Sequence, residues 1–169
     1  VLGMVAGRVP VAVTVADGTI PDMTASAQHA QDAGASWLVL QPPRPPASGT
    51  DLIAFFAAVA AATRLPCAIQ NAPEFLGLGL SEAELLDLHR CQPNITLVKA
   101  EASAASIGRL VGALAGKMAV FNGRAGLELT DNFRAGVAGM IPGIETIDLQ
   151  VAIERAMRAG DEAAAEALY

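Results

Sequence analysis

The segment from residue 81 to residue 100 reads SEAELLDLHRCQPNITLVKA and contains a helix signal followed by a strand signal. Its first half opens with a capping box formed by Ser81 and Glu84, and apolar residues then recur at spacings of three and four. Its second half, Ile95-Thr96-Leu97-Val98, is a short aliphatic run typical of a buried strand. We therefore expect a helix over Ser81–Cys91 and a strand over Ile95–Ala100.

The same alternation of strand and helix continues in both directions along the chain. Strands are expected at Val9–Val15, Trp37–Leu40, Pro66–Asn71, Ile95–Ala100, Met118–Asn122 and Ala138–Pro142. Helices are expected at Pro21–Ala33, Thr50–Thr63, Ser81–Cys91, Ser103–Ala115, Leu127–Ala135 and Ile147–Ala159, with a last piece at Asp161–Tyr169. Three of these helical runs are followed by glycines suited to a left-handed helix end, which are Gly34, Gly136 and Gly160.

Strands that alternate with helices favour parallel pairing through right-handed crossovers. Six such β/α units are two fewer than a closed (β/α)8 barrel contains, and an open, doubly wound sheet also accommodates six strands. The segment after the first strand, Val15-Ala16-Asp17-Gly18-Thr19, is not the glycine-rich phosphate loop of a nucleotide-binding sheet. The absence of a glycine-rich phosphate loop at this position argues against the open sheet.

The composition describes a globular chain with few charges, because 53% of the residues are hydrophobic and 17% are charged. The net charge is −6 and the basic residues are scattered, which argues against nucleic-acid binding. The longest apolar run, Leu52 to Ala62, is about half of what a membrane-spanning helix needs, so no membrane association is expected. Cys67 and Cys91 lack metal-ligand or redox spacing, which indicates reduced thiols in a cytoplasmic protein without a metal site.

Polar residues follow the expected strands, at the edge where active sites lie in both candidate architectures. Lys99 stands out among them, because the chain has only two lysines and this one ends an apolar run. With the period of two of a strand, Lys99 and Glu101 share one face with Ile95. If that face points into a barrel, desolvation disfavours the ammonium and leaves a nucleophilic amine. The alternative is a lysine that extends out of the strand end or pairs with Glu101.

Several segments together resemble the lysine Schiff-base aldolase and dehydratase family, typified by dihydrodipicolinate synthase and N-acetylneuraminate lyase. The segment Asn94-Ile95-Thr96-Leu97-Val98-Lys99 looks like the sixth strand, which supplies the family's Schiff-base lysine. The segments similar to the third, fourth, fifth and last two strands are Gly7-Arg8-Val9-Pro10-Val11, Leu40-Gln41-Pro42-Pro43, Leu65-Pro66 with Asn71-Ala72-Pro73, and Gly123 with the run from Gly136 to Ile141. We therefore predict an α/β fold of the (β/α)8 TIM-barrel class, in which residues 1–169 form a single partial domain containing strands 3 to 8.

The resemblance implies a small-molecule 2-oxo acid as substrate, an imine on Lys99, and no cofactor. It places substrate contacts at Arg44, Asn71, Asn122, Gly123, Arg124 and Ile141. It also implies a homo-oligomer, either a tetramer or a dimer. The family's first two strands would precede Val1 and its carboxyl-terminal helices would follow Tyr169, so we expect the working protein to be longer at both ends.

The chain departs from the family at several of these positions. Gln70 stands where the family has a phenolic proton relay, and an amide can hydrogen-bond but cannot ionise. Arg44 replaces a tyrosine borrowed by a neighbouring subunit, and Arg124 replaces an acidic residue, which suggests a substrate with extra negative charge. The family's Lys-Glu pair reads Lys99-Ala100-Glu101, so the carboxylate moves onto the lysine's own face. There Glu101 can serve as a catalytic acid or base, or it can hold Lys99 charged.

Two functions are compatible with these residues. The first is a Schiff-base-forming lyase, an aldolase or dehydratase, that acts on a 2-oxo acid such as pyruvate or a keto-deoxy sugar acid, with Lys99, Gln70 and Glu101 as its catalytic residues. The second is a catalytically silent member of the family that binds a ligand or assembles with partners. Loss of the phenol at position 70 favours the second function, and retention of Lys99 favours the first.

Overall fold

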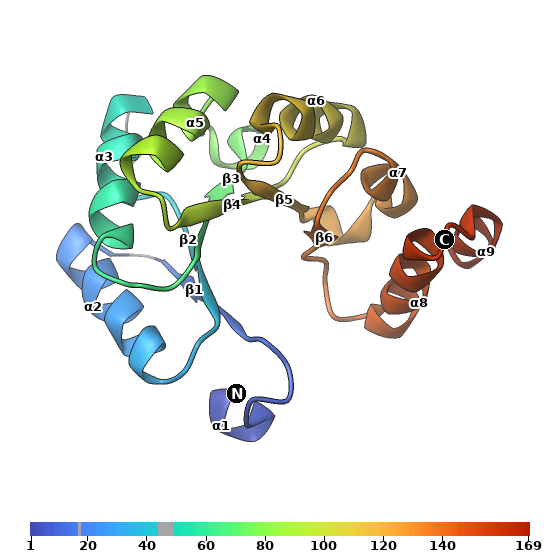
Figure 1. Cartoon of the computed structure of the whole chain (residues 1–169), viewed down its shortest axis with the longest axis horizontal. Coiled ribbons are helices and arrows are strands. Elements are labelled where there is room, and N and C mark those ends of the chain that lie inside the picture. Colours follow the sequence, from blue (N-terminus) through green and yellow to red (C-terminus); the bar gives the residue numbers. More distant parts are fainter. Residues whose placement is uncertain (17, 44–48) are drawn as a thin grey trace. The chain divides into compact units, whose positions relative to one another are not determined.

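The computed structural model describes residues 1–16, 18–43 and 49–169, and strands and helices alternate along them as predicted (Figure 1). The strands are β1 (Ala12–Val15), β2 (Trp37–Leu40), β3 (Cys67–Asn71), β4 (Ile95–Ala100), β5 (Ala119–Asn122) and β6 (Gly139–Met140). The helices are α1 (Leu2–Val5), α2 (Ile20–Asp32), α3 (Gly49–Ala60), α4 (Pro73–Leu76), α5 (Glu82–Cys91), α6 (Ala104–Leu114), α7 (Leu129–Arg134), α8 (Ile147–Arg158) and α9 (Glu162–Leu168), with a 3-10 turn η1 (Arg124–Gly126).

Within the described residues, the six strands form one sheet in the order β1-β2-β3-β4-β5-β6. The pairs β1–β2, β2–β3 and β5–β6 are parallel, with Ala12 opposite Trp37, Leu38 opposite Cys67, and Phe121 opposite Gly139. A doubly wound sheet reverses its strand order at a switch point, whereas a barrel adds each strand beside the previous one. The sequential order therefore confirms the predicted partial (β/α)8 barrel.

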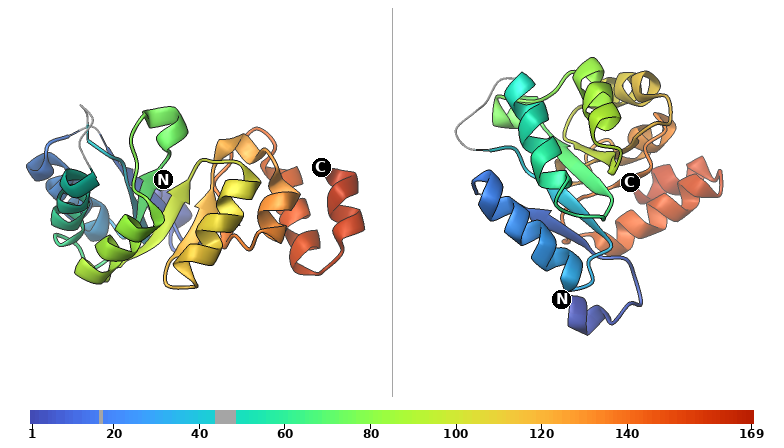
Figure 2. Two further views of the ribbon diagram at one scale, coloured as in Figure 1. Left: turned by 90° about the horizontal axis from the view of Figure 1, so that it is seen from above. Right: turned by 60° about the vertical axis from the view of Figure 1, so that its left-hand side comes forward.

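The chain divides into two compact units, residues 1–98 and 99–169, with the division inside β4. In the first unit, α2, α3 and α5 cover one side of the strands, and α3 packs against both α2 and α5 (Figures 1 and 2). The core of this unit is mostly aliphatic, with Leu38, Ile69 and Leu85 fully buried, and it also contains the buried aromatic ring of Phe56. Buried residues fill β2 and β3 almost without alternation, as expected for strands covered on both faces.

In the second unit, α8 and α9 pack against α7 around a small core of Leu129, Ile153 and Ala165. Arg134 of α7 ties α9 to this core through Glu162 at 2.9 Å and Glu166 at 2.5 Å. The hydrogen bond from Arg134 lowers the pKa of the Glu166 carboxyl from 4.5. Two separate elements of the carboxyl-terminal part are thereby joined by charge as well as by packing.

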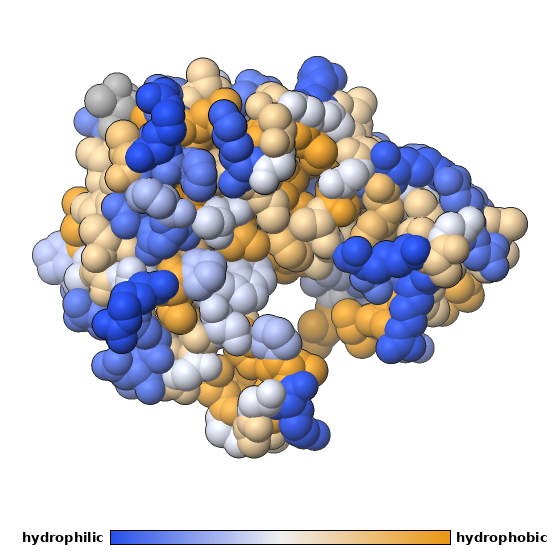
Figure 3. Space-filling view, in the orientation of Figure 1, coloured by the Kyte–Doolittle hydropathy of each residue, from blue (hydrophilic) through white to orange (hydrophobic). Residues whose placement is uncertain are grey.

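Apolar side chains gather on the surface at the start of α8 (Figure 3). They include Ile144, which is 84% exposed, together with Ile147, Leu149 and Val151. Apolar clusters of this kind on a protein surface mark places where another segment or chain packs. Among the described residues, no helix is both long enough and apolar enough to span a membrane.

The predicted helix signals are present in the structure. Ser81 Oγ accepts from the Glu84 backbone N–H at 3.4 Å, while the Glu84 carboxylate accepts from the Ser81 N–H at 2.8 Å. Thr19 and Asp22 form a second capping box at the start of α2. Hydrogen bonds from the backbone and side chain of Ser81 lower the pKa of Glu84 from 4.5. A carboxylate at the first turn of a helix is stabilised by the helix dipole as well.

The structure adds three short elements that the sequence did not predict, namely α1, α4 and η1. Each has at most four residues, too few to produce a periodic apolar pattern. The turn α4 begins at Pro73 and is followed by Gly77, whose φ of +68° is the left-handed conformation that favours glycine. Asn71 closes the segment that follows, because its amide donates to Leu80 O at 2.9 Å and accepts from Leu80 N at 2.8 Å.

The two cysteines give a chemical test of this fold. Cys67 is fully buried in β3, where burial raises the pKa of its thiol from 9.0 to about 12, whereas Cys91 is exposed at the end of α5. The thiolate is the reactive form, so iodoacetamide at neutral pH should modify Cys91 and leave Cys67 untouched in the native whole protein. Peptide mapping by mass spectrometry measures both sites, and denatured protein, in which both react, is the control. Equal labelling of the two native thiols would contradict the placement of β3.

Candidate functional site at the carboxyl ends of the strands

Lys99 and Glu101 form an ion pair at the carboxyl end of β4. The distance from Lys99 Nζ to Glu101 Oε1 is 2.9 Å, and the two side chains are only 18% and 20% exposed. The flanking residues Val98 and Ala100 are buried on the opposite face of the strand. The prediction that Lys99 and Glu101 share one face is therefore confirmed. The pairing of Lys99 with Glu101 is the arrangement named above as the alternative to a free nucleophilic amine, so the catalytic role of Lys99 stays a prediction. An ion pair with this little exposure is less screened by salt than a surface pair, and it places a carboxylate in contact with the Lys99 side chain.

Gly123 follows β5 and leaves the space that Glu101 occupies. Its backbone N–H donates to Ala100 O at 2.9 Å, which brings the ends of β4 and β5 together. A Cβ atom at position 123 would lie 3.0 Å from Glu101 Cγ and 3.4 Å from Glu101 Oε1. Gly123, which was predicted as a substrate contact, therefore leaves space for the Glu101 side chain. A larger residue at this position would come into close contact with the carboxylate that pairs with Lys99.

Asn122, the last residue of β5, is fully buried. Its amide donates to Ala102 O at 2.9 Å, and its carbonyl oxygen accepts from Ala102 N at 3.3 Å. These bonds fix the backbone immediately after Glu101. The predicted substrate contact of Asn122 stays a prediction, and the geometry assigns the side chain to holding a loop. Ile141 lies half-buried beyond β6, where its backbone N–H donates to Asn122 O at 2.8 Å.

Arg124 lies in a strained turn and is paired with an acid. Its Nη1 atom lies 2.8 Å from Glu128 Oε2, and the same oxygen accepts from the Ala104 N–H at 2.9 Å, at the start of α6. Arg124, Ala125 and Glu128 all have φ between +53° and +55°, a left-handed conformation that costs a non-glycine residue roughly 1–2 kcal/mol. The charge of Arg124 is thus offset by Glu128, which weakens the inference from Arg124 to a more anionic substrate.

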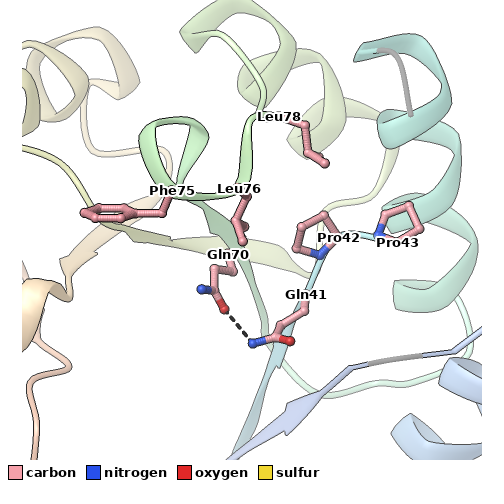
Figure 4. A pocket seen from close by; sticks show the side chains of 7 residues that line it. All are labelled: Gln41, Pro42, Pro43, Gln70, Phe75, Leu76 and Leu78. Carbon is pink, nitrogen blue, oxygen red and sulfur yellow. Dashed lines mark hydrogen bonds between the residues drawn. The ribbon is translucent and has the colours of Figure 1, made fainter. Parts of the chain in front are cut away.

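Gln70 lines a pocket in the first unit (Figure 4). Gln41 Nε2 donates to Gln70 Oε1 at 2.9 Å, and the two amides come from the ends of neighbouring strands β2 and β3. The pocket has a volume of about 370 Å³. Its wall is completed by Pro42, Pro43, Phe75, Leu76 and Leu78. The described lining therefore combines apolar surface with uncharged amides, which suits a hydrogen-bonding group better than an ion.

Two further predicted substrate contacts belong to the same part of the chain. Asn71 is 9% exposed and uses its side chain to hold Leu80, so its direct contact with a substrate also stays a prediction. Arg44 lies outside the described residues. Among the residues that the structure describes, no group of three or more His, Cys, Asp and Glu side chains is placed to hold a metal ion.

Three residues that sequence reasoning did not assign to the site now lie next to residues that it did assign. Gln41 bonds Gln70, Glu128 bonds Arg124, and Asn132 bonds Asn122. A polar residue directly after an apolar strand is a usable sequence signal for Gln41. Neither Glu128 nor Asn132 has such a signal, because Asn132 lies inside a helix and Glu128 lies in an irregular loop.

Comparison with known proteins assigns the family. All of residues 1–169 match the dihydrodipicolinate synthetase family. The chain belongs to this family. Comparison with curated proteins gives no significant match.

Several solved structures share the fold. A prophage protein of the dihydrodipicolinic acid synthase family from E. coli, in complex with pyruvate, is 28% identical with a TM-score of 0.91, over 99% of this chain and 58% of that one. Dihydrodipicolinate synthase from Acinetobacter baumannii, also complexed with pyruvate, is 24% identical with a TM-score of 0.90, over 99% and 58% of the two chains. Sialic acid aldolase from Ruminococcus gnavus is 22% identical with a TM-score of 0.89, over 99% and 56%. The chain thus spans less than three fifths of the length of each of these structures.

The space at Gly123 predicts the effect of adding one methyl group. Gly123→Ala should push the Glu101 carboxylate away from Lys99, because its Cβ would lie 3.0 Å from Glu101 Cγ. A crystal structure of the variant measures the separation of Lys99 Nζ from Glu101 Oε1, which should exceed the present 2.9 Å. Gly112→Ala is the matched control, because nothing lies within 4 Å of its added Cβ in α6. That control should raise the free energy of unfolding by about 0.5–1 kcal/mol. An unchanged ion pair in Gly123→Ala would show that Glu101 does not depend on the glycine.

Proposed function

We propose that the protein is a Schiff-base-forming lyase of the aldolase or dehydratase type, with Lys99 as its nucleophile and a 2-oxo acid such as pyruvate or a keto-deoxy sugar acid as its substrate. The observation that carries this proposal is the contact between Lys99 Nζ and Glu101 Oε1 at 2.9 Å, at the carboxyl end of a central strand. Active sites of (β/α)8 barrels are built at this end of the strands. Membership of the dihydrodipicolinate synthetase family supports the same reaction class.

The ion pair provides the first proton transfer. Glu101 takes a proton from the Lys99 ammonium, and the neutral amine then attacks the ketone carbon of the 2-oxo acid. The former carbonyl oxygen receives protons and leaves as water, so that a protonated imine forms on Nζ. The imine then accepts an electron pair from the adjacent carbon. If the pair comes from the next carbon–carbon bond, that bond breaks and the hydroxyl on the departing carbon gives up its proton, which releases an aldehyde. If it comes from a carbon–hydrogen bond, a base takes the proton, and the resulting enamine expels the β-hydroxyl, which takes up a proton and leaves as water.

Gln70 has a different role from the phenol whose place it takes. An amide neither releases nor accepts a proton at neutral pH, so Gln70 binds and orients the substrate rather than relaying protons. Glu101 is then the ionisable group that serves Lys99.

Pyruvate is the simplest substrate to test. The structures from E. coli and Acinetobacter baumannii contain it, and the first of these is 28% identical to this chain. We further propose that residues 1–169 belong to one barrel domain of a cytoplasmic homo-oligomer, a tetramer or a dimer. A catalytically silent family member is the alternative, and it is favoured by the amide at position 70 and by the pairing of Lys99 with Glu101.

Imine trapping tests the nucleophile directly. Incubation of the whole protein with pyruvate and then borohydride should leave one reduced adduct per chain on Lys99, as located by peptide mapping. Lys99→Arg should abolish labelling and leave the fold intact, because arginine keeps the bulk and charge but cannot form the imine.

Lys117 is the internal control for this labelling. It is exposed in a turn before β5, at the opposite end of that strand from Asn122, and it should remain unlabelled. If a folded whole protein carries no adduct after treatment with pyruvate and with longer 2-oxo acids, the lyase proposal fails and the silent family member replaces it.

Two substitutions at position 70 separate binding from proton transfer. Gln70→Ala should lower turnover without unfolding the protein, because a half-buried group at a strand end contributes little to the core. Gln70→Tyr restores the ionisable residue of the family and should change the pH dependence of turnover, which steady-state kinetics measures. Wild-type kinetics in both variants would mean that Gln70 takes no part in the reaction.

A further inference from the structure

Two fully buried asparagines connect the loop that carries Glu101 to the loop that carries Arg124. Asn122 ends β5 and Asn132 lies in α7, and both side chains are 0% exposed. Asn122 Nδ2 donates to Asn132 Oδ1 at 2.7 Å. A buried amide–amide bond of this length keeps one geometry, because an unpaired amide in the interior is costly.

The first asparagine acts on the segment next to the ion pair. Through its two bonds with the backbone of Ala102, Asn122 sets the path of the chain one residue beyond Glu101. The direction in which the Glu101 side chain leaves the backbone depends on that path. The distance of 2.9 Å between Lys99 Nζ and Glu101 Oε1 therefore depends on the orientation of the Asn122 amide.

The second asparagine fixes that orientation. Asn132 presents its oxygen to Asn122, and its Nδ2 donates to Leu127 O at 3.2 Å and to Glu128 O at 2.6 Å. With its nitrogen committed to two backbone carbonyls, the Asn132 amide cannot flip, and so the Asn122 amide cannot flip either. The loop held in this way contains the left-handed residues Arg124, Ala125 and Glu128, and such conformations persist only where surrounding contacts over-determine them.

We propose that Asn132 is a positioning residue for the Lys99–Glu101 pair and that it acts through Asn122. It touches neither member of the pair and holds the buried hydrogen bonds that direct Glu101 toward Lys99. The kinetic part of this proposal rests on the proposed function, whereas the structural part does not. The position of Glu101 and the rate of imine formation are therefore measured separately.

The structural measurement is the crystal structure of the Asn132→Leu whole protein. Leucine has a similar branched shape but removes the acceptor for Asn122 and both donors to the 127–128 backbone. The Glu101 carboxylate should then lose its contact with Lys99 Nζ, which is 2.9 Å in the wild type. An ion pair that stays at this distance would overturn the proposal, whatever the protein catalyses.

The kinetic measurement is the rate of imine formation with pyruvate, trapped by borohydride and expressed per folded molecule. Asn132→Leu should slow this step roughly 10- to 100-fold, the range expected when a reacting group is displaced by about 1 Å. The pyruvate concentration that gives half the maximal rate should change little, because Asn132 contacts no substrate. Asn122→Leu should slow the step as much, and the double variant no further, because the two residues act in series.

Asn94→Leu is the matched control. Asn94 precedes the same strand at its other end, where Nδ2 donates to the carbonyls of Ala60 and Thr63 at 3.0 and 3.1 Å. Its replacement should also lower the unfolding temperature, yet leave the rate of imine formation unchanged. Equal slowing in Asn94→Leu and Asn132→Leu would reduce Asn132 to a stabilising residue and overturn the proposal.

If Asn132→Leu does not fold, a milder variant at the same position provides the test. Asn132→Ser removes the acceptor for the Asn122 amide and both donors to the 127–128 backbone, without adding an apolar side chain or burying a charge. It should slow imine formation in the same way as Asn122→Leu, and a wild-type rate in Asn132→Ser would overturn the proposal. Absence of any adduct on Lys99 in the wild type would instead refute the proposed function, while the crystal structure would still decide the positioning role.

Discussion

The period of two along β4 is the constraint on which the candidate site depends. It sends Val98 and Ala100 into the core and leaves Lys99 and Glu101 together on the other face, where they meet at 2.9 Å. A shift of one residue in the register of this strand would exchange the two sets and bury both charges. The aliphatic residues that hold the register therefore also determine which side chains meet at the strand end.

Much of the fold was predictable, because its elements carry local signals. The Ser81–Glu84 capping box and the glycines after α2, α7 and α8 are present as expected, and those glycines have φ of +90°, +89° and +76°. The Lys99–Glu101 contact was also within reach, since it follows from alternation over three residues. In each case the deciding interaction lies within one element or at its end, so the sequence contains it.

The remaining parts of the site depend on contacts between residues far apart in the sequence. Asn132 gave no signal, because an asparagine in a helix usually faces solvent or ends the helix. Its buried position becomes visible only when Asn122 and the 127–128 backbone are brought beside it. The left-handed residues Arg124 and Glu128 were equally hidden, since neither is a residue type that favours that conformation.

The change at position 70 and the change at position 101 belong to one chemical problem. Imine formation requires a group that takes and returns protons near the attacking amine. An amide at position 70 cannot do so, and Gln41 holds that amide by a hydrogen bond of 2.9 Å. A carboxylate one residue after a lysine lies on the opposite face of a strand, whereas a carboxylate two residues after it lies on the same face. The spacing Lys99-Ala100-Glu101 therefore supplies an ionisable group beside the lysine in a chain whose residue 70 cannot ionise, and the proposed lyase reaction depends on Glu101 acting as that group.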